Sequence, residues 1–299
     1  MKNLYKIMII LITSLLFVGC MGGYQETTGS EENSTYKKTA KGKATEDINV
    51  AGETKYETVK KINDAKTTKI DEENTLEGLT ICIDPGHGKL TKKVSKTEPV
   101  APGSQIMKAA TAGGTVGTVT KITEETLNLT VSLKLKKALA EKGAKIIMVR
   151  ESNVCNMTNI ERTEFWNSSG ADLTIRIHAN GSNDKEVSGV LMMVPGSKYI
   201  KDKELLEKSA LAGKYIMEAV LKNTKAESKG TVKSTDLTGF NWSQIPVVLL
   251  EMGFMTNPDE DRLLNTEDYQ NKIVSGIVEG VENYHKSPLS GIEGVQRGQ

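Results

Sequence analysis

Cysteines, histidines and aromatic side chains are scarce in this sequence. Of its 299 residues, three are cysteine and three are histidine, and aromatic residues make up 5%. The cysteines, Cys20, Cys82 and Cys155, show none of the paired spacings that indicate a disulfide framework or a zinc site built from thiolates. Each cysteine therefore needs an interpretation of its own.

The sequence also lacks a charge excess of either sign. Lys and Arg number 39 and Asp and Glu number 38, which leaves a formal net charge of +1. Net charge therefore gives no electrostatic reason to expect nucleic acid or an anionic membrane surface as a partner. A chain of this length can form one sizeable domain and keep room for an export signal and a linker. No feature of the sequence indicates an oligomeric state.

No apolar run reaches the roughly 20 residues that a membrane-spanning helix requires. The run at residues 7–18 follows a positively charged start, which is typical of a signal peptide. It ends in the sequence FVGC, which resembles the lipobox of bacterial lipoproteins, although Phe17 stands where Leu is usual. The resemblance implies removal of residues 1–19 and diacylation of Cys20.

Two other fates of this segment stay open beside lipidation. Ordinary secretory cleavage would remove Cys20 or leave it without a role, and a retained leader helix would itself be the anchor. All three fates predict export. Residues 20–77 follow as a flexible polar tether, because Ser, Thr, Lys, Glu, Asn and Gly dominate them and no apolar periodicity persists.

From residue 78 onward, strand patterns alternate with helix patterns. The alternation predicts βαβ units, and hence the α/β class: a single domain with a mostly parallel, twisted sheet flanked by helices over residues 78–286, before a short polar tail at 287–299. Strands are predicted at residues 79–83, 144–149, 172–177, 189–194 and 247–251, and helices at 126–140, 159–169, 202–221 and 267–284.

Four polar residues are predicted to meet at one edge of this sheet. His87, His178 and Glu251 stand at or just beyond the carboxyl ends of separate strands, and Glu124 opens a helix. Two imidazoles and a carboxylate form an open ligand set for catalytic zinc, with a fourth position left for water. A further carboxylate beside that water would be a general base and acid. The third histidine, His285, is expected to be exposed.

The short sequence motifs around these residues resemble those of a known protein family. CIDPGHG at residues 82–88, EETLNL at 124–129, ADLTIRIHAN at 171–180 and IPVVLLEMGFMTN at 245–257 occur in this order at domain-scale separations. Together they resemble the zinc-dependent N-acetylmuramoyl-L-alanine amidases of the Amidase_3 type over roughly residues 78–285. Further agreement comes from Arg150, Arg162 and Asn167, which fall where the family has its TR and R…AN elements.

The resemblance implies a role for each of the four polar residues. His87, His178 and Glu124 are expected to bind one zinc ion, and Glu251 matches the catalytic glutamate. Glu124 is preferred to Glu125 by counting back from the Asn-Leu pair, and a shift of one residue would turn the carboxylate by about 100° around a helix. Glu125 is then expected to interact with the helix N-terminus.

The sequence also offers three candidate substrate contacts and one insertion, and two of these features, Arg176 and the insertion, depart from the family pattern. Arg176 stands where the family commonly has Ser, and either it meets a peptide carboxylate near the zinc or it pairs with a structural acid. Asn180 and Trp242 are further candidates for substrate binding. The polar stretch at residues 89–120 is an insertion between the first two sequence motifs. It is expected to be a lid, a substrate-gripping loop or a tolerated surface loop.

The remaining residues of note have simpler interpretations. Cys82 lies in an apolar strand and is expected to be a small buried hydrophobe, whereas Cys155 lies in a polar loop and could be a free thiol. Trp166 follows Phe165 on a predicted helix and is expected in the core.

The resemblance implies a peptidoglycan hydrolase facing the cell wall. The expected reaction is cleavage of the amide bond between N-acetylmuramic acid and L-alanine by a zinc-activated water, with Glu251 as the base. Two alternatives stay open: a zinc peptidase acting within the stem peptide, and a non-catalytic wall-binding lipoprotein. The intact set of two histidines and two glutamates argues against the second alternative.

Overall fold

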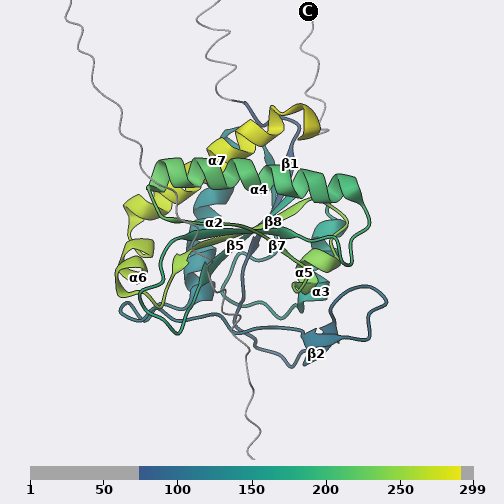
Figure 1. The fold of residues 1–299 in the computed structure, drawn as a ribbon, viewed down its shortest axis with the longest axis horizontal. Coiled ribbons are helices and arrows are strands. Elements are labelled where there is room, and N and C mark those ends of the chain that lie inside the picture. Colours follow the sequence, from purple (N-terminus) through teal and green to yellow (C-terminus); the bar gives the residue numbers. More distant parts are fainter. Residues whose placement is uncertain (1–73, 291–299) are drawn as a thin grey trace, which may run out of the picture. The chain divides into compact units, whose positions relative to one another are not determined.

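Six strands form one central sheet in the computed structural model, which describes residues 74–290. The strands lie in the order β4-β1-β5-β8-β6-β7, and Figure 1 labels β1, β5, β7 and β8 among them. They are β1 (Thr80–Pro85), β4 (Lys145–Met148), β5 (Leu173–Asn180), β6 (Val190–Pro195), β7 (Ser228–Ser234) and β8 (Val247–Phe254). The pairs β1/β4, β1/β5, β5/β8 and β6/β7 are parallel, and only β6/β8 is antiparallel. The predicted α/β class with a mostly parallel sheet is confirmed.

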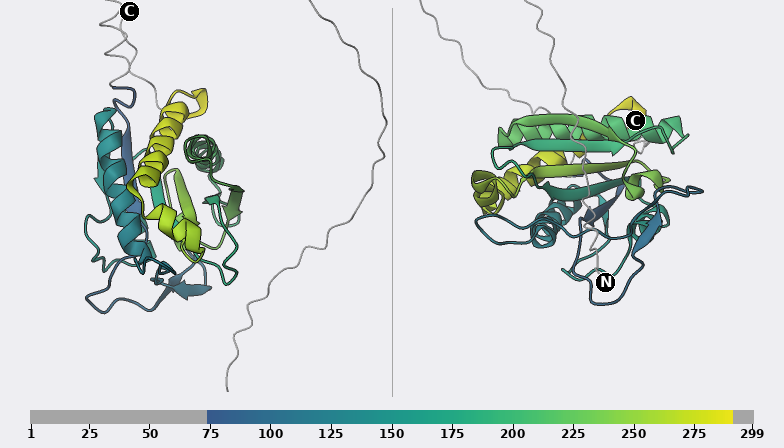
Figure 2. Two further views of the ribbon diagram at one scale, coloured as in Figure 1. Left: turned by 90° about the vertical axis from the view of Figure 1, so that its left-hand side faces the viewer. Right: turned by 60° about the horizontal axis from the view of Figure 1, so that its bottom comes forward.

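Three long helices cover one face of this sheet. They are α2 (Glu124–Glu141), α4 (Lys203–Thr224) and α7 (Glu267–His285), and the left view of Figure 2 shows α7 between α2 and α4. Their apolar side chains pack with alternate residues of the central strands, among them Leu173, Ile175, Ile177, Val248 and Leu250. Because side chains alternate across a strand, the intervening residues of β5 and β8 face the opposite side.

The opposite face of the sheet carries shorter elements. Trp166 of α3 (Asn159–Asn167) packs with Cys82, and Phe240 of α5 (Thr238–Asn241) packs with Val247 and Leu249. Figure 1 groups α3 and α5 with β2 at one end of the domain. With both faces covered, β5 is buried along almost its whole length. This second face receives the polar residues that the sequence singled out.

Several elements were not predicted. Strand β7 is an exposed edge strand whose sequence, SKGTVKS, has no buried apolar side. Residues 89–120 contain a two-stranded antiparallel ribbon of β2 (Thr97–Pro99) and β3 (Met107–Ala109). Short helices also form at α6 (Pro258–Leu264) and at the 3₁₀ turn η1 (Pro288–Ser290). Elements this short or this polar carry no sustained periodicity.

The boundaries of the packed domain also differ from the prediction. Leu76 is fully buried in the main core, so packed structure begins ahead of residue 78. The predicted signal peptide at residues 1–19, Cys20 and the tether up to residue 73 lie outside the described residues, as do residues 291–299 of the tail. Within the part of the chain that the structure describes, no helix combines the length and the apolar character needed to cross a membrane.

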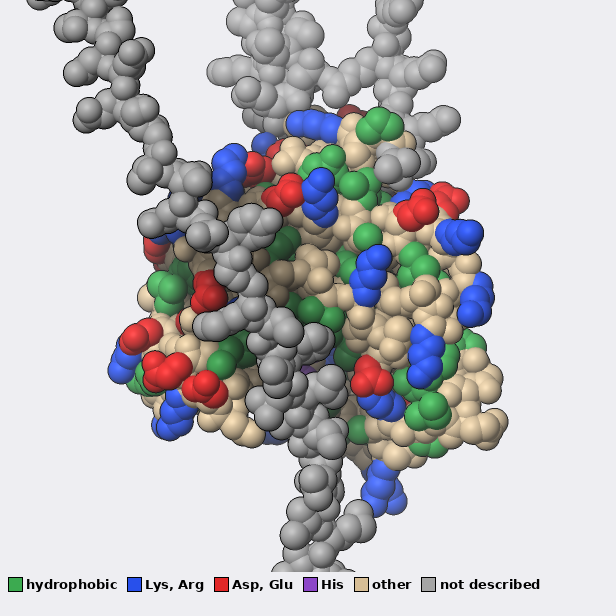
Figure 3. All heavy atoms as spheres, viewed as in Figure 1, with side chains coloured by type: hydrophobic (Ala, Val, Ile, Leu, Met, Phe, Trp, Pro, Cys, Tyr) green, Lys and Arg blue, Asp and Glu red, His purple; other side chains and the backbone are tan. Residues whose placement is uncertain are grey.

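Charged side chains of both signs are interspersed on the face of the domain seen in Figure 3. On this visible face, no large patch of one sign forms. The surface therefore agrees with the balanced composition of the whole chain, in which 39 basic and 38 acidic residues leave a net charge of +1.

Candidate active site

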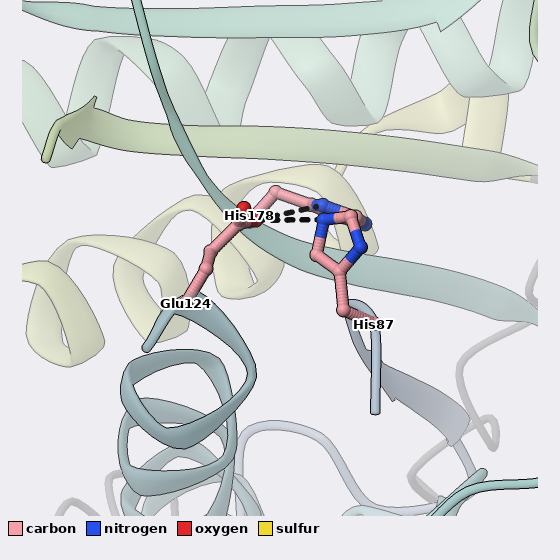
Figure 4. A group of neighbouring side chains, drawn as sticks. All are labelled: His87, Glu124 and His178. Atoms are coloured by element: carbon pink, nitrogen blue, oxygen red, sulfur yellow. Dashed lines mark hydrogen bonds and ion pairs between the residues drawn. The ribbon is translucent and has the colours of Figure 1, made fainter. Parts of the chain in front are cut away.

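His87, Glu124 and His178 converge on the face of the sheet that carries α3 and α5. Each offers one ligand atom, and these atoms all lie within 4.8 Å of one another (Figure 4). Glu124 Oε1 is 3.0 Å from His87 Nε2 and 3.2 Å from His178 Nδ1. The two imidazole rings meet edge to face with their centroids 4.9 Å apart. Three of the four residues expected at the site are therefore neighbours.

The loop after β1 presents His87 in a constrained conformation. His87 has a φ of 60°, in the left-handed region that few non-glycine residues adopt. Its Nδ1 donates a hydrogen bond to Ala112 O at 2.9 Å, so the proton lies on Nδ1 and the lone pair of Nε2 points to the cluster. Ala112 belongs to the insertion, which therefore fixes the orientation of a candidate ligand.

Glu124 is the first residue of α2 and is held by three donors. The backbone N–H of Thr115 donates to Oε2 at 2.9 Å, the side chain of Asn128 donates to Oε1 at 3.1 Å, and Ala179 N donates to Oε1 at 3.2 Å. Its side chain is only 5% exposed. The structure places Glu124 in the cluster, whereas its neighbour Glu125 is partly exposed and uses its backbone carbonyl to accept from Arg150.

Burial and mutual contact set the charges of the cluster. Burial lowers the pKa of His178 to about 4, so this imidazole is neutral and free to offer a lone pair. Burial alone would raise the pKa of Glu124, but its hydrogen bonds to His178 and His87 outweigh burial and hold this pKa well below its usual range. His87 is likewise desolvated, yet its contact with Glu124 raises its pKa.

Glu251 lies beside the cluster on the neighbouring strand. It is paired with His178 in the register of β5 and β8, so both side chains leave the same face of the sheet. Its Oε2 is buried and has no hydrogen-bond partner among the described residues. Burial raises the pKa of Glu251 to about 8, and the negative charge of Glu124 adds to this effect. The carboxyl group is thus suited to exchange a proton near neutral pH.

The structure corrects the predicted positions of two of these residues along their strands. His178 lies inside β5, which continues to Asn180, and Glu251 lies inside β8, which continues to Phe254. Both strands extend because their parallel pairing continues beyond His178 and Glu251 to Asn180 and Phe254. The site is thus built on the carboxyl-terminal half of the sheet surface as well as on its rim.

A buried ionic network below the cluster was not predicted from the sequence. Asp84 is fully buried, and its two carboxylate oxygens accept from Arg162 Nη1 at 2.6 Å and from Arg176 Nε at 2.9 Å. Arg162 also donates to the carbonyls of Pro85 and His87. Although burial would raise the pKa of Asp84, the charges of the two arginines lower it. The network holds the loop that carries His87.

Arg150 supports the same loop from β4's carboxyl end. Its Nε donates to Pro85 O at 2.9 Å and its Nη2 to Gly86 O at 2.7 Å and Glu125 O at 2.9 Å. The guanidinium thus ties the loop to the first turn of α2. The available signal for this role was the match of Arg150 and Arg162 to conserved elements of the family pattern.

A cavity of about 450 Å³ opens beside the cluster. His87, His178 and Glu251 line it together with Arg176. One wall comes from the insertion, and another comes from the loop after β7 together with the start of α5. These walls contribute Lys108, Ala109, Thr111 and Ala112 on the first side and Asp236, Leu237, Thr238 and Gly239 on the second. Residues 89–120 therefore contribute to the cavity, and their role as a lid, a substrate-gripping loop or a surface loop stays a prediction.

Two candidate substrate contacts lie elsewhere. Trp242 is not among the residues that line the cavity, and its Nε1 donates to Pro99 O at 3.0 Å, which attaches the insertion to the domain. Asn180 is also absent from the cavity lining, and its Oδ1 accepts from Gly181 N at 2.8 Å. Asn167 contacts the same segment as Trp242, since its amide donates to Trp242 O.

The remaining predictions concern the cysteines, Trp166 and His285. Cys82 and Cys155 are both buried free thiols, so Cys82 is the small hydrophobe expected, and the two are not paired. Trp166 is fully buried, as expected for a core residue. The expectation of an exposed His285 was wrong: the residue is partly buried with Nδ1 fully covered, because the chain turns back over the end of α7 into η1.

Fold and site together define an α/β protein with an open cluster of potential metal ligands beside a substrate-sized cavity. The family model for N-acetylmuramoyl-L-alanine amidase (Amidase_3) matches residues 81–283. The chain therefore belongs to the N-acetylmuramoyl-L-alanine amidase family, and its substrate is peptidoglycan. The predicted family is confirmed.

Individual relatives agree with this assignment. The chain is 27% identical over 226 residues to the germination-specific N-acetylmuramoyl-L-alanine amidase of Bacillus subtilis, covering 70% of this chain and 81% of that protein. It is 29% identical over 210 residues to the uncharacterized protein YqiI of Bacillus subtilis, covering 70% and 86% respectively. Among solved structures, the amidase Ami1 of Mycobacterium smegmatis shares the fold, with a TM-score of 0.62 and 22% identity over 70% of this chain and 97% of that one.

Proposed function

We propose that the protein cleaves the amide bond between N-acetylmuramic acid and L-alanine with one zinc ion held by His87, Glu124 and His178. The observation that carries this proposal is the convergence of the three ligand atoms within 4.8 Å of one another at the wall of the cavity. Glu251, paired with His178 across β5 and β8, is proposed as the general base.

The donor set fits zinc on its chemistry. Two imidazole nitrogens and one carboxylate oxygen are a common set for catalytic zinc, and they leave one position for water. The Nε2 atom of His178 is buried without a hydrogen-bond partner among the described residues, which is costly unless another group binds at that nitrogen. Near Glu124, Gly114 leaves space that a side chain would fill, since a Cβ there would lie 3.0 Å from Oε2.

The remaining chemistry comes from the protein's own side chains. Zinc, when bound, supplies a water of lowered pKa and polarises the scissile carbonyl. Glu251 takes a proton from the attacking water and delivers it to the departing amine of L-alanine. The backbone carbonyl of Ala112 and the donors around Glu124 keep the ligands oriented throughout.

A zinc peptidase that cuts within the stem peptide would use the same groups. The products decide between the two reactions, because the amidase creates a new free amino terminus on L-alanine. We therefore expect purified cell wall treated with the enzyme to show L-alanine as its new amino-terminal residue. A different amino-terminal residue would assign the enzyme to the peptidases. No release of amino termini by the zinc-loaded protein would favour the wall-binding lipoprotein instead.

We also propose that the protein is exported and anchored by lipid. The lipobox-like motif FVGC, which ends at Cys20 after the apolar run at residues 7–18, supports both export and lipidation. In this organisation residues 1–19 are removed, the polar residues between Cys20 and the packed domain form the tether, and the catalytic domain faces the wall from the outer side of the cytoplasmic membrane. Labelling with a radioactive fatty acid tests it: the native chain is expected to be labelled and the Cys20→Ala variant unlabelled.

A further inference from the structure

We propose that Arg176 binds a free carboxylate on the residue that follows L-alanine in the stem peptide. The enzyme would then prefer stem peptides in which this carboxyl group is free over those in which it is amidated. The inference rests on the proposed function and specifies which part of the substrate the cavity recognises.

The position of Arg176 suits contact with a substrate already bound at the cluster. Arg176 precedes His178 by two residues on β5, so both side chains leave the same face, at a spacing of about 7 Å along the strand. Both residues line the cavity, together with Glu251. Two residues of extended peptide also span about 7 Å at most. When L-alanine is bound at the cluster, a group on the next residue of the peptide therefore lies within reach of Arg176.

Two contacts hold the guanidinium group of Arg176 before any ligand arrives, and a glycine leaves room for it. Nε donates to Asp84 Oδ2 at 2.9 Å, and the group lies 5.7 Å from the centroid of the Trp166 ring. A Cβ on Gly239 would lie 2.9 Å from Nη1, so the glycine leaves the space in which the group lies. With the side chain only 7% exposed, little conformational entropy is left to lose on binding.

The terminal nitrogens of Arg176 remain available. Among the described residues, Arg176 makes its one hydrogen bond through Nε, whereas Arg162 uses both terminal nitrogens on Asp84, Pro85 and His87. Nη1 and Nη2 of Arg176 therefore keep their donors for a ligand in the cavity. The planar pair of N–H groups matches a carboxylate that accepts two parallel hydrogen bonds.

Charge balance favours an anion at this position. Asp84 is the single acid paired with both Arg162 and Arg176, so its one negative charge meets two positive charges. A carboxylate from the substrate would compensate the second guanidinium. In the stem peptide, the acidic residue after L-alanine is linked onward through its side-chain carboxyl group. Its α-carboxyl group is therefore either free or converted to an amide.

Lys108 offers a matched comparison. It is a second cation on the cavity lining, and its Nζ lies 3.3 Å from Asp236 Oδ1, with both side chains exposed. An exposed pair of this kind contributes little to recognition because solvent screens it. Replacing Lys108 or Arg176 with Gln removes one positive charge from the cavity in either case. The two variants thus separate a local contact from general charge.

The experiment compares two soluble muramyl tripeptides that differ only in a free or an amidated α-carboxyl group on the second residue. For the native zinc-loaded protein we expect kcat/KM to be about 10- to 100-fold higher on the free form, the range for a charged hydrogen bond in a desolvated site. In Arg176→Gln this ratio falls towards one, mainly through KM. Arg176→Lys keeps part of it, Gly239→Ala lowers it, and Lys108→Gln keeps it.

Two results would overturn the proposal. One is equal turnover of the two substrates by the native protein, which needs no variant and so does not depend on folding. The other is an equal fractional loss on both substrates in Arg176→Gln, the result of a purely structural pairing with Asp84. If neither tripeptide yields a free amino terminus on L-alanine while the protein is loaded with zinc, the proposed function itself fails and the inference falls with it.

Discussion

Gly86 and His178 approach each other so closely that a methyl group on Gly86 would lie 2.3 Å from Cε1 of the imidazole. No heavy atom of a side chain fits there without displacing the ring. Only glycine fits at this position of the DPGHG motif, because the His178 side chain of the neighbouring strand β5 occupies the adjacent space. It keeps the His178 ring in the position where the ring meets Glu124.

Replacing Gly86 with Ala is expected to weaken zinc binding by about 10- to 100-fold, because a displaced ligand loses its orientation. Gly113→Ala is the matched control, since a Cβ on Gly113 would meet nothing within 4 Å. Zinc affinity measured by competition with a chelating dye checks the difference. Equal affinity of the two variants would show that the His178 ring is free to move.

Glu251→Gln is expected to bind zinc like the native protein and to lose activity by about 10²- to 10⁴-fold. The amide keeps the shape of the side chain but cannot take the proton from water. Zinc content and release of amino termini from purified wall are measured on the same preparation. Turnover close to that of the native protein would remove Glu251 from the role of base.

Glu124→Gln is expected to lose zinc, whereas Glu125→Gln keeps it. Only Glu124 has its carboxylate in the cluster, since Glu125 is partly exposed. Chelation of the native protein should stop hydrolysis, and added zinc should restore it. Because zinc binds the folded state, the melting temperature should also fall on chelation. A loss of zinc from Glu125→Gln alone would exchange the two assignments.

Acid is expected to destabilise the zinc-free protein partly through Asp84. The pKa of this carboxyl group is lowered in the folded state despite its burial, because Arg162 and Arg176 neutralise it. Its contribution to the free energy of unfolding is therefore fully present above the unfolded pKa of about 3.9 and is lost as the pH falls through the folded value.

The variant Asp84→Asn isolates this contribution. At pH 7 it is expected to be about 3–5 kcal/mol less stable than the native protein, because two buried cations lose their partner. The difference should shrink as the pH is lowered below about 4, because the carboxyl group of Asp84 then takes up a proton in the unfolded chain while it stays charged in the folded protein. Urea unfolding in the presence of a chelator, repeated from pH 7 to pH 3, measures the trend. A difference that stays constant with pH would contradict it.

The sequence was sufficient to find the residues of the cluster but not what holds them. The motifs that contain His87, Glu124, His178 and Glu251 each lie next to a clearly predicted strand or helix. The convergence of these residues therefore follows from the topology of a parallel sheet. The bond from His87 to Ala112 could not be predicted, because it depends on the path of a polar insertion without periodicity.

Residues with two plausible roles were resolved only by packing. Arg176 was open between a structural acid and a peptide carboxylate, and its bond to Asp84 establishes the first contact. Trp242 was a candidate for substrate binding, yet its position against Pro99 follows from the course of the insertion. Strand β7 was missed because an exposed polar edge has no hydrophobic pattern to read.

The hydrogen bond from His87 to Ala112 limits how the family's loops can be exchanged. The same insertion supplies Thr115 N to Glu124, so two of the three clustered residues depend on its backbone. Trimming or transplanting residues 89–120 as a cassette would therefore remove part of the catalytic framework along with the loop. A chimera would need a donor loop that returns a carbonyl and an N–H to these two points, whatever its length or its side chains.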